Sequence, residues 1–194
     1  SEMRCLCVLL VDVSGSMKLC EDTINISIKN FMSDLLHGRN GFKEYSKEQI
    51  ELAIVQFDSD VKVLRLPSLV KRGDRLPVLQ VRGLNTNTVG AVRKAMSIIE
   101  NRKIEHKMKG LSYYRPWIIL LTDGNPNPCS QSELQSLLYD VSHSISENKF
   151  MLTAIGIGNS VDKEFLSAIS NNNYHRIGQA NISTFFQALS ASMT

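Results

Sequence analysis

Apolar residues form two kinds of pattern along the 194-residue chain. Continuous aliphatic and β-branched runs, such as RCLCVLLVDV at 4–13, are typical of strands that are buried on both faces of a sheet. Between these runs, apolar residues recur every three or four positions, which indicates amphipathic helices. The predicted strands are 4–13, 49–57, 61–66, 117–121, 150–157 and 174–177. The predicted helices are 24–36, 89–99, 134–145, 161–170 and 182–193.

The alternation of strands and helices also predicts how the strands pair. Only Asp58-Ser59-Asp60 separates the strands 49–57 and 61–66, so these two must be antiparallel neighbours, and Pro67 is expected to end the second. Helices join the other strands, which favours right-handed crossovers and parallel pairing. We therefore expect an α/β fold with a doubly wound, mostly parallel six-stranded sheet, one antiparallel edge strand and helices on both faces. A single domain, residues 1–194, accounts for the length.

Composition and charge exclude several classes of protein without identifying a function. Hydrophobic residues make up 43% of the chain and charged residues 21%, close to the globular average. The 22 Lys and Arg exceed the 19 Asp and Glu by three, too small an excess to indicate nucleic-acid binding. The densest basic stretch, 93–109, is interpreted as a solvated helix face and the loop after it.

The chain carries no recognisable export or membrane signal. No apolar run approaches the roughly 20 residues that cross a bilayer, and no small-residue cleavage site follows the first apolar run. The cysteines have neither the spacing of a disulfide framework nor that of a zinc site. They are Cys5, Cys7, Cys20 and Cys129. We therefore expect reduced thiols and a cytoplasmic location.

Hydroxyl and carboxylate residues follow the predicted strands. Asp12, Ser14 and Ser16 form a D-x-S-x-S string after the first strand, and Asp123 follows the strand 117–121 in a T-D-G turn. The string N-T-N-T at 85–88 precedes the second helix. Open α/β sheets bind ligands beyond the carboxyl ends of their strands. An all-oxygen set without His or thiolate suits a hard divalent cation such as Mg²⁺.

Each of these strings alone has an ordinary structural explanation. Asp12 or Ser14 would serve equally well as a helix cap, and T-D-G is a common turn. Their agreement in position favours a shared site. Other chemistries lack their motifs, because the chain has no complete dinucleotide-binding fingerprint, no phosphate-binding G-K-[ST] and no G-x-S-x-G. His37, His106, His143 and His175 lie outside the strand ends and are expected on the surface or on helix faces.

These three segments resemble the metal-ion-dependent adhesion site (MIDAS) of von Willebrand factor type A domains, and the resemblance covers essentially the whole chain. It implies that Ser14, Ser16 and Thr86 contact the metal directly, whereas Asp12 and Asp123 often act through water. The family often has Gly-Gly before the threonine, where this chain has Gly83-Leu84-Asn85. Thr88 is therefore kept as an alternative to Thr86.

The resemblance implies a protein-binding module rather than an enzyme. A partner's Glu or Asp would complete the coordination of Mg²⁺, with Mn²⁺ or Ca²⁺ as alternative metals. Family behaviour adds a switch in which ligation shifts the last helix, 182–193. The strings LLVDVSGSM and LLTDGNPN are similar to those of bacterial intracellular TerY-like proteins of tellurite resistance, which implies a stress-response partner.

The competing hypothesis is an enzyme, in which the same site supports Mg²⁺-dependent phosphoryl transfer or hydrolysis. Such chemistry needs a positioned base and a phosphate cradle. Lys18 is the only base near the D-x-S-x-S string, and it is interpreted as a loop residue. Turnover of phosphoesters with Mg²⁺ would separate the two hypotheses.

Overall fold

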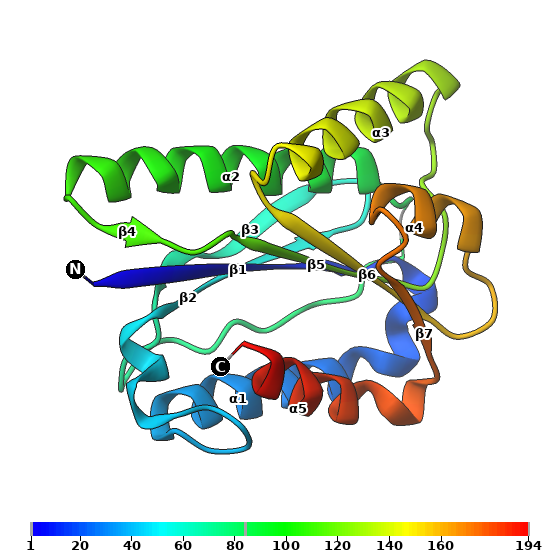
Figure 1. The fold of residues 1–194 in the computed structure, drawn as a ribbon. Coiled ribbons are helices and arrows are strands. Elements are labelled where there is room, and N and C mark those ends of the chain that lie inside the picture. The colour runs from blue at the N-terminus through cyan, green and yellow to red at the C-terminus, as the bar shows by residue number, and fades with distance from the viewer. Residues whose placement is uncertain (1, 84, 194) are drawn as a thin grey trace.

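The computed structural model, which describes residues 2–83 and 85–193, contains a seven-stranded sheet (Figure 1). Six strands follow the order β3-β2-β1-β5-β6-β7, and the two-residue β4 pairs with the start of β1. The strands are β1 (Met3–Asp12), β2 (Ile50–Phe57), β3 (Val61–Leu69), β4 (Ser112–Tyr113), β5 (Trp117–Thr122), β6 (Met151–Ile157) and β7 (Tyr174–Ile177). Every pair is parallel except β2 with β3, so the predicted fold class is confirmed.

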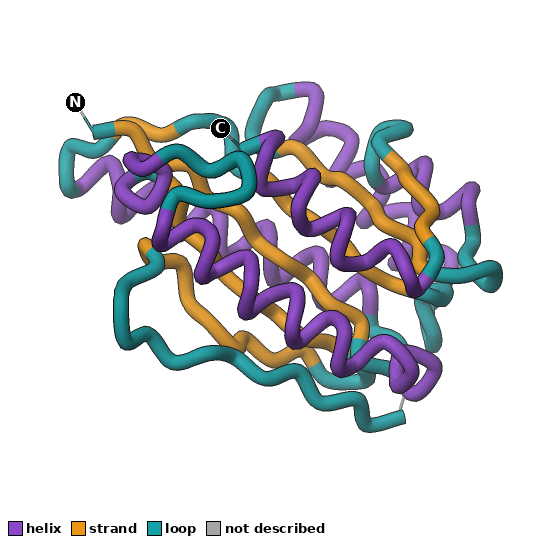
Figure 2. Tube along the Cα trace, turned by 90° about the horizontal axis from the view of Figure 1, so that it is seen from below, coloured by secondary structure: helices purple, strands orange, loops and turns teal. Residues whose placement is uncertain are grey.

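Helices cover both faces of this sheet. The α-helices are α1 (Glu21–His37), α2 (Thr88–Met108), α3 (Gln131–Ser146), α4 (Lys163–Ile169) and α5 (Ile182–Ser192). Short 3₁₀ helices are η1 (Gly15–Cys20), η2 (Glu44–Glu48) and η3 (Gln179–Asn181). Helices α1 and α5 lie on one face, and α2, α3 and α4 lie on the other (Figures 1 and 2). No helix in the described part of the chain has the length and apolar character that a membrane crossing requires.

Strand β1 lies between β2 and β5, and this central position explains its long apolar run. Cys7 and Val11 pack in the core under α1 and α5, whereas Leu6 and Leu10 pack in the core under α2, α3 and α4. All four side chains are at most 2% exposed. Because successive side chains of a strand point to opposite faces, a sheet covered on both sides needs apolar residues at every position.

Strand β3 extends beyond the end that the sequence predicts. Pro67 was expected to end it after Leu66, but the strand continues to Leu69. Its pairing with β2 shifts register between Leu52 and Ile54, where Pro67 falls on the opposite strand. Proline lacks the N–H that a ladder needs, and an edge strand with an irregular register tolerates this loss.

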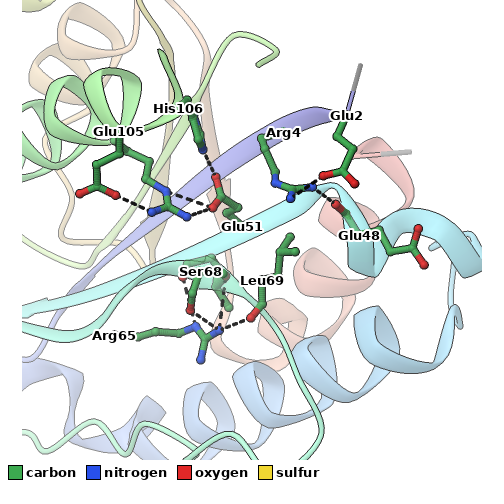
Figure 3. A network of polar contacts seen from close by, with 11 residues as sticks. Glu2, Arg4, Glu48, Glu51, Arg65, Ser68, Leu69, Glu105 and His106 are labelled. Atoms are coloured by element: carbon green, nitrogen blue, oxygen red, sulfur yellow. Dashed lines mark hydrogen bonds and ion pairs between the residues drawn. The ribbon is translucent and has the colours of Figure 1, made fainter. Parts of the chain in front are cut away.

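His106 lies on a helix face, one of the two predicted locations, and this face is buried. It is 2% exposed, and its Nε2 lies 2.5 Å from Oε1 of Glu51, a carboxylate that is itself 1% exposed (Figure 3). Arg102 donates to the other carboxylate oxygen of Glu51 and reaches Glu105 at 2.6 Å. The basic stretch 93–109 therefore has solvated positions and also a buried network of charged side chains. This network connects the end of α2 to the start of β2.

Candidate metal centre

The sheet brings the ends of β1 and β5 together. The two strands are parallel neighbours, and Val11 lies opposite Leu121. Asp12 and Asp123, which follow these paired residues, therefore meet at the same edge of the sheet. The 3₁₀ helix η1 begins at Gly15, so Ser14 and Ser16 turn back over the strand ends. Four of the five residues that the sequence predicts as a site are thus placed in two adjoining loops.

Both carboxylate oxygens of Asp12 accept hydrogen bonds inside the protein. Oδ1 accepts from the backbone N–H of Ser14 at 2.8 Å and from its hydroxyl at 2.6 Å. Oδ2 accepts from the hydroxyl of Thr122 at 2.7 Å. Asp12 and Thr122 are fully buried. In the sequence, Thr122 is only the first residue of the T-D-G turn; its hydrogen bond to Asp12 arises because β1 and β5 are neighbouring strands.

A second hydroxyl–carboxylate pair lies nearer the surface. The exposed Ser16 hydroxyl donates to Oδ1 of Asp123 at 2.8 Å. Burial raises the pKa of the Asp123 carboxyl, the hydrogen bond from Ser16 opposes this effect, and the nearby Asp12 raises the pKa further. Lys18, the nearest base in sequence, forms an ion pair with Glu21 at 3.0 Å.

Two glycines allow the first loop to approach the segment that precedes Thr86. A Cβ added to Gly15 would lie 2.9 Å from the Cα of Gly83. Gly83 has a φ of +85°, a conformation that glycine adopts without strain. The two backbones therefore pack directly against each other, which explains why position 15 is a glycine.

Thr86 is joined to the loop that carries Asp123. Its backbone N–H donates to the carbonyl oxygen of Asn127 at 2.7 Å, and the N–H of Asn127 donates back at 2.9 Å. Thr86 is 7% exposed. Thr88 is fully buried at the first turn of α2, and its hydroxyl has no hydrogen-bond partner within the described residues. The structure places both threonines at this edge of the sheet.

Two side chains of α1 hold the segment before Thr86 in place. Asn25 forms hydrogen bonds in both directions with the backbone of Leu79, at 2.8 and 3.1 Å. Glu21 accepts from the N–H of Val81 at 2.7 Å, and this bond and Lys18 lower the pKa of Glu21. Sequence reasoning missed both residues, because their partners lie more than fifty positions away and no local string marks them.

The donor set fits a hard divalent cation that binds hydroxyl groups as well as carboxylates. Within the part of the chain that is described, no three His, Cys, Asp or Glu side chains gather as a metal cluster. A thiolate or imidazole site is therefore not built here. The oxygens at the sheet edge are those of two carboxylates and of the serine and threonine hydroxyls, which are the ligand types that Mg²⁺ accepts.

The sequence model of the von Willebrand factor type A domain family matches residues 7–190. No curated protein matches the chain. Among solved structures, a von Willebrand factor type A protein from Catenulispora acidiphila is 17% identical with a TM-score of 0.70, and the match covers 98% of this chain and 43% of that one.

Two further solved structures share the fold. The pilus adhesin SpaC from Lactobacillus rhamnosus GG, in an open conformation, is 14% identical with a TM-score of 0.73, covering 100% of this chain and 30% of the adhesin. Proximal thread matrix protein 1 from the mussel byssus, with a zinc-occupied MIDAS motif, is 16% identical with a TM-score of 0.61, covering 98% and 46%. The chain spans less than half the length of these structures.

Proposed function

The chain belongs to the von Willebrand factor type A domain family, and from this membership we propose that it is a metal-dependent protein-binding module. Domains of this family commonly use a MIDAS for protein interaction. The proposed metal residues are Asp12, Ser14, Ser16, Thr86 and Asp123. The proposed ligand that completes the site is a Glu or Asp side chain of another protein.

The observation that carries the proposal is the pairing of each serine hydroxyl with an aspartate. The Ser14 hydroxyl donates a hydrogen bond to Asp12, and the Ser16 hydroxyl donates a hydrogen bond to Asp123. Because both protons are engaged, lone pairs of the two hydroxyl oxygens are left for a cation. The carboxylates then supply negative charge through the hydroxyls without binding the metal directly. The metal therefore attracts an incoming carboxylate strongly.

Mg²⁺ is the proposed metal, with Mn²⁺ and Ca²⁺ as alternatives. Hydroxyl and carboxylate oxygens are hard ligands, and Mg²⁺ commonly keeps some positions for water or for a ligand oxygen. The mussel protein was solved with zinc at its MIDAS motif, so zinc belongs in the same experiment. When bound, the metal would supply Lewis acidity toward a partner's carboxylate, while this chain's hydroxyls and aspartates hold it in position.

The test is a thermal and calorimetric titration of the protein with Mg²⁺, Mn²⁺, Ca²⁺ and Zn²⁺. A ligand at 100 times its Kd stabilises a folded protein by about 2.7 kcal/mol. For a chain of this length, that corresponds to a rise in Tm of about 5–10 °C. Asp12→Asn and Asp123→Asn should lose most of this rise, because each removes a charge at the site.

A matched control is Asp22→Asn, which makes the same chemical change at an exposed position of α1. It should keep the full metal response. The site assignment is wrong if the wild-type protein gains no stability from any of the four metals. It is also wrong if the Asp12 and Asp123 variants respond like the control.

The binding module is proposed in preference to an enzyme that uses the same edge. Lys18 is engaged with Glu21, and His106 is buried against Glu51 at the opposite end of β2. Neither is therefore placed as a base for phosphoryl transfer at Asp12. Steady turnover of generic phosphoesters or nucleotides in Mg²⁺, lost in Asp12→Asn, would overturn the binding-module proposal.

The subtype within the family, the cellular location and the extent of the domain are also proposals. The short strings LLVDVSGSM and LLTDGNPN support a TerY-like, tellurite-resistance form in the cytoplasm, with residues 1–194 as one domain. The four unpaired cysteines are compatible with a reducing compartment. A pull-down repeated in Mg²⁺ and in chelator tests the partner: a protein of a tellurite or stress-response system should be retained only with Mg²⁺. A metal-dependent partner from another system would contradict this assignment.

A further inference from the structure

The outer side of β3 is an unpaired sheet edge. The strand pairs only with β2, and no backbone hydrogen bond within the described residues joins 61–66 to any other segment. Alternate residues of an antiparallel strand turn their N–H and C=O groups away from the neighbouring strand. Figure 2 shows the loop that follows β3 passing outside this edge, but that loop does not pair with it. This edge therefore offers backbone groups that no described segment pairs with, and a further strand can hydrogen-bond to such groups.

Two grooves flank this edge, one on each face of the sheet. The first, of about 340 Å³, lies between β3 and α2, and the second, of about 400 Å³, lies between β3 and the segment 75–80. The apolar side chains in the first include Val63, Leu66 and Ile98, and those in the second include Leu64, Leu76 and Val78. Leu66 is 71% exposed and Val78 is 63% exposed.

The free charge around both grooves is positive. Lys94 lines the groove beside α2, and Lys62 and Arg75 line the other. None of these three forms an ion pair with any described residue. Glu105, the acidic residue of the first groove, is already bonded to Arg102. An occupant of these grooves should therefore carry negative charge.

We propose that β3 is a docking edge for an extended segment of a partner protein in which apolar and acidic side chains alternate. The main chain of that segment would pair with 61–66, and its successive side chains would point to opposite faces, one groove for each set. A second copy of this chain fits less well. Antiparallel pairing of 61–66 with itself would set each Lys62 opposite Arg65 of the other copy, and Pro67 interrupts the ladder.

The probe is a labelled ten-residue peptide of alternating valine and glutamate, with binding measured by fluorescence anisotropy in EDTA. The chelator separates this edge from the metal site, so the outcome does not depend on the proposed MIDAS. The peptide should bind at least tenfold more tightly than a peptide of alternating valine and lysine. It should also bind at least tenfold more tightly than five valines followed by five glutamates, because the block order mixes valine and glutamate on each face and cannot place one kind in each groove.

Charge reversal on the protein locates the binding. The double variant Lys62→Glu and Arg75→Glu should weaken binding at least tenfold. The matched control is Lys163→Glu with Arg176→Glu, which reverses one exposed lysine and one exposed arginine at the opposite edge of the sheet. The control should change the affinity less than threefold. Equal losses in the two double variants would indicate non-specific attraction and overturn the proposal.

Backbone methylation of the peptide tests the pairing itself. Two peptides, N-methylated at the odd or at the even positions, keep their side chains but lose the N–H groups on one edge. At least one of them should bind at least tenfold more weakly than the unmodified peptide. The proposal is overturned if both bind as well as the unmodified peptide or if the unmodified peptide does not bind. A dimer of the free protein that the peptide dissociates would assign the edge to self-association instead.

Discussion

The two threonines near the proposed metal site, Thr86 and Thr88, differ in how their hydroxyls are placed. Thr86 sits on the bridge to Asn127, beside the loop of Asp123. Thr88 is fully buried at the start of α2, with a hydroxyl that no described residue satisfies. A buried polar group without a partner costs about 1–3 kcal/mol. The unsatisfied hydroxyl is therefore either a stability cost or a ligand position, and substitution by valine, which has a similar shape, separates the two.

We expect Thr86→Val to weaken Mg²⁺ binding at least tenfold and Thr88→Val to leave it within threefold. Removal of the Thr88 hydroxyl should also leave the metal-free protein at least as stable, because no hydrogen bond is lost. Calorimetric titration gives the affinities, and urea unfolding in EDTA gives the stabilities. A loss of Mg²⁺ affinity in Thr88→Val together with normal binding by Thr86→Val would assign the ligand to Thr88.

At the scale of elements, helix α1 positions the segment that precedes Thr86 of the proposed metal site. Asn25 and Glu21 hold the backbone at Leu79 and Val81, a few residues before Thr86. Gly15 and Gly83 then bring this segment against the first loop. The described residues between β3 and α2, 70–83 and 85–87, form no regular helix or strand apart from the bridge at Thr86. These side-chain bonds therefore supply the order that a strand or helix would otherwise provide.

Asn25→Ala should therefore loosen the segment without unfolding the protein. The change removes two hydrogen bonds, each worth about 1 kcal/mol. We expect a Tm that is a few degrees lower and Mg²⁺ binding that is weakened about three- to tenfold, because Thr86 must be ordered when the metal binds. Hydrogen exchange should speed up at residues 79–83 before it does elsewhere. Asn30→Ala, on the same helix but without a bond to the segment, is the matched control; an equal loss of affinity in it would refute this positioning role.

The buried strands and the motifs at their ends can be predicted from the sequence, whereas contacts between distant segments cannot. The runs at β1, β5 and β6 are apolar at nearly every position, so their burial follows from composition, and the D-x-S-x-S and T-D-G strings mark the ends of two of them. What could not be predicted depends on partners distant in sequence. Asn25 meets Leu79, Gly15 meets Gly83, and β4 has only two residues, whose pairing with β1 gives no periodic signal.

In the whole molecule, the proposed metal residues and the buried network of Glu51, Arg102 and His106 lie at opposite ends of the sheet. Leu6 pairs with Glu51 and Asp12 pairs with Phe57, so six residues of strand separate the two ends. At 3.3 Å per residue this is about 20 Å. Helix α2 spans the same interval, with Thr88 at its start and His106 near its end. The network is thus an anchor for α2 that does not touch the metal loops.

Glu51→Gln should consequently separate stability from metal binding. The substitution leaves Arg102 and His106 with a neutral partner in a nearly water-free site, and breaking such a buried charge arrangement typically costs about 3–5 kcal/mol. Urea unfolding should show this loss. Mg²⁺ affinity, measured at a temperature where the variant is fully folded, should stay within threefold, because distant sites without shared partners act independently.

A matched surface change, Glu164→Gln, should alter neither quantity, since that glutamate is exposed and forms no ion pair with a described residue. If Glu51→Gln abolished metal binding while the protein stayed folded, α2 would have to transmit the disturbance from one end of the sheet to the other.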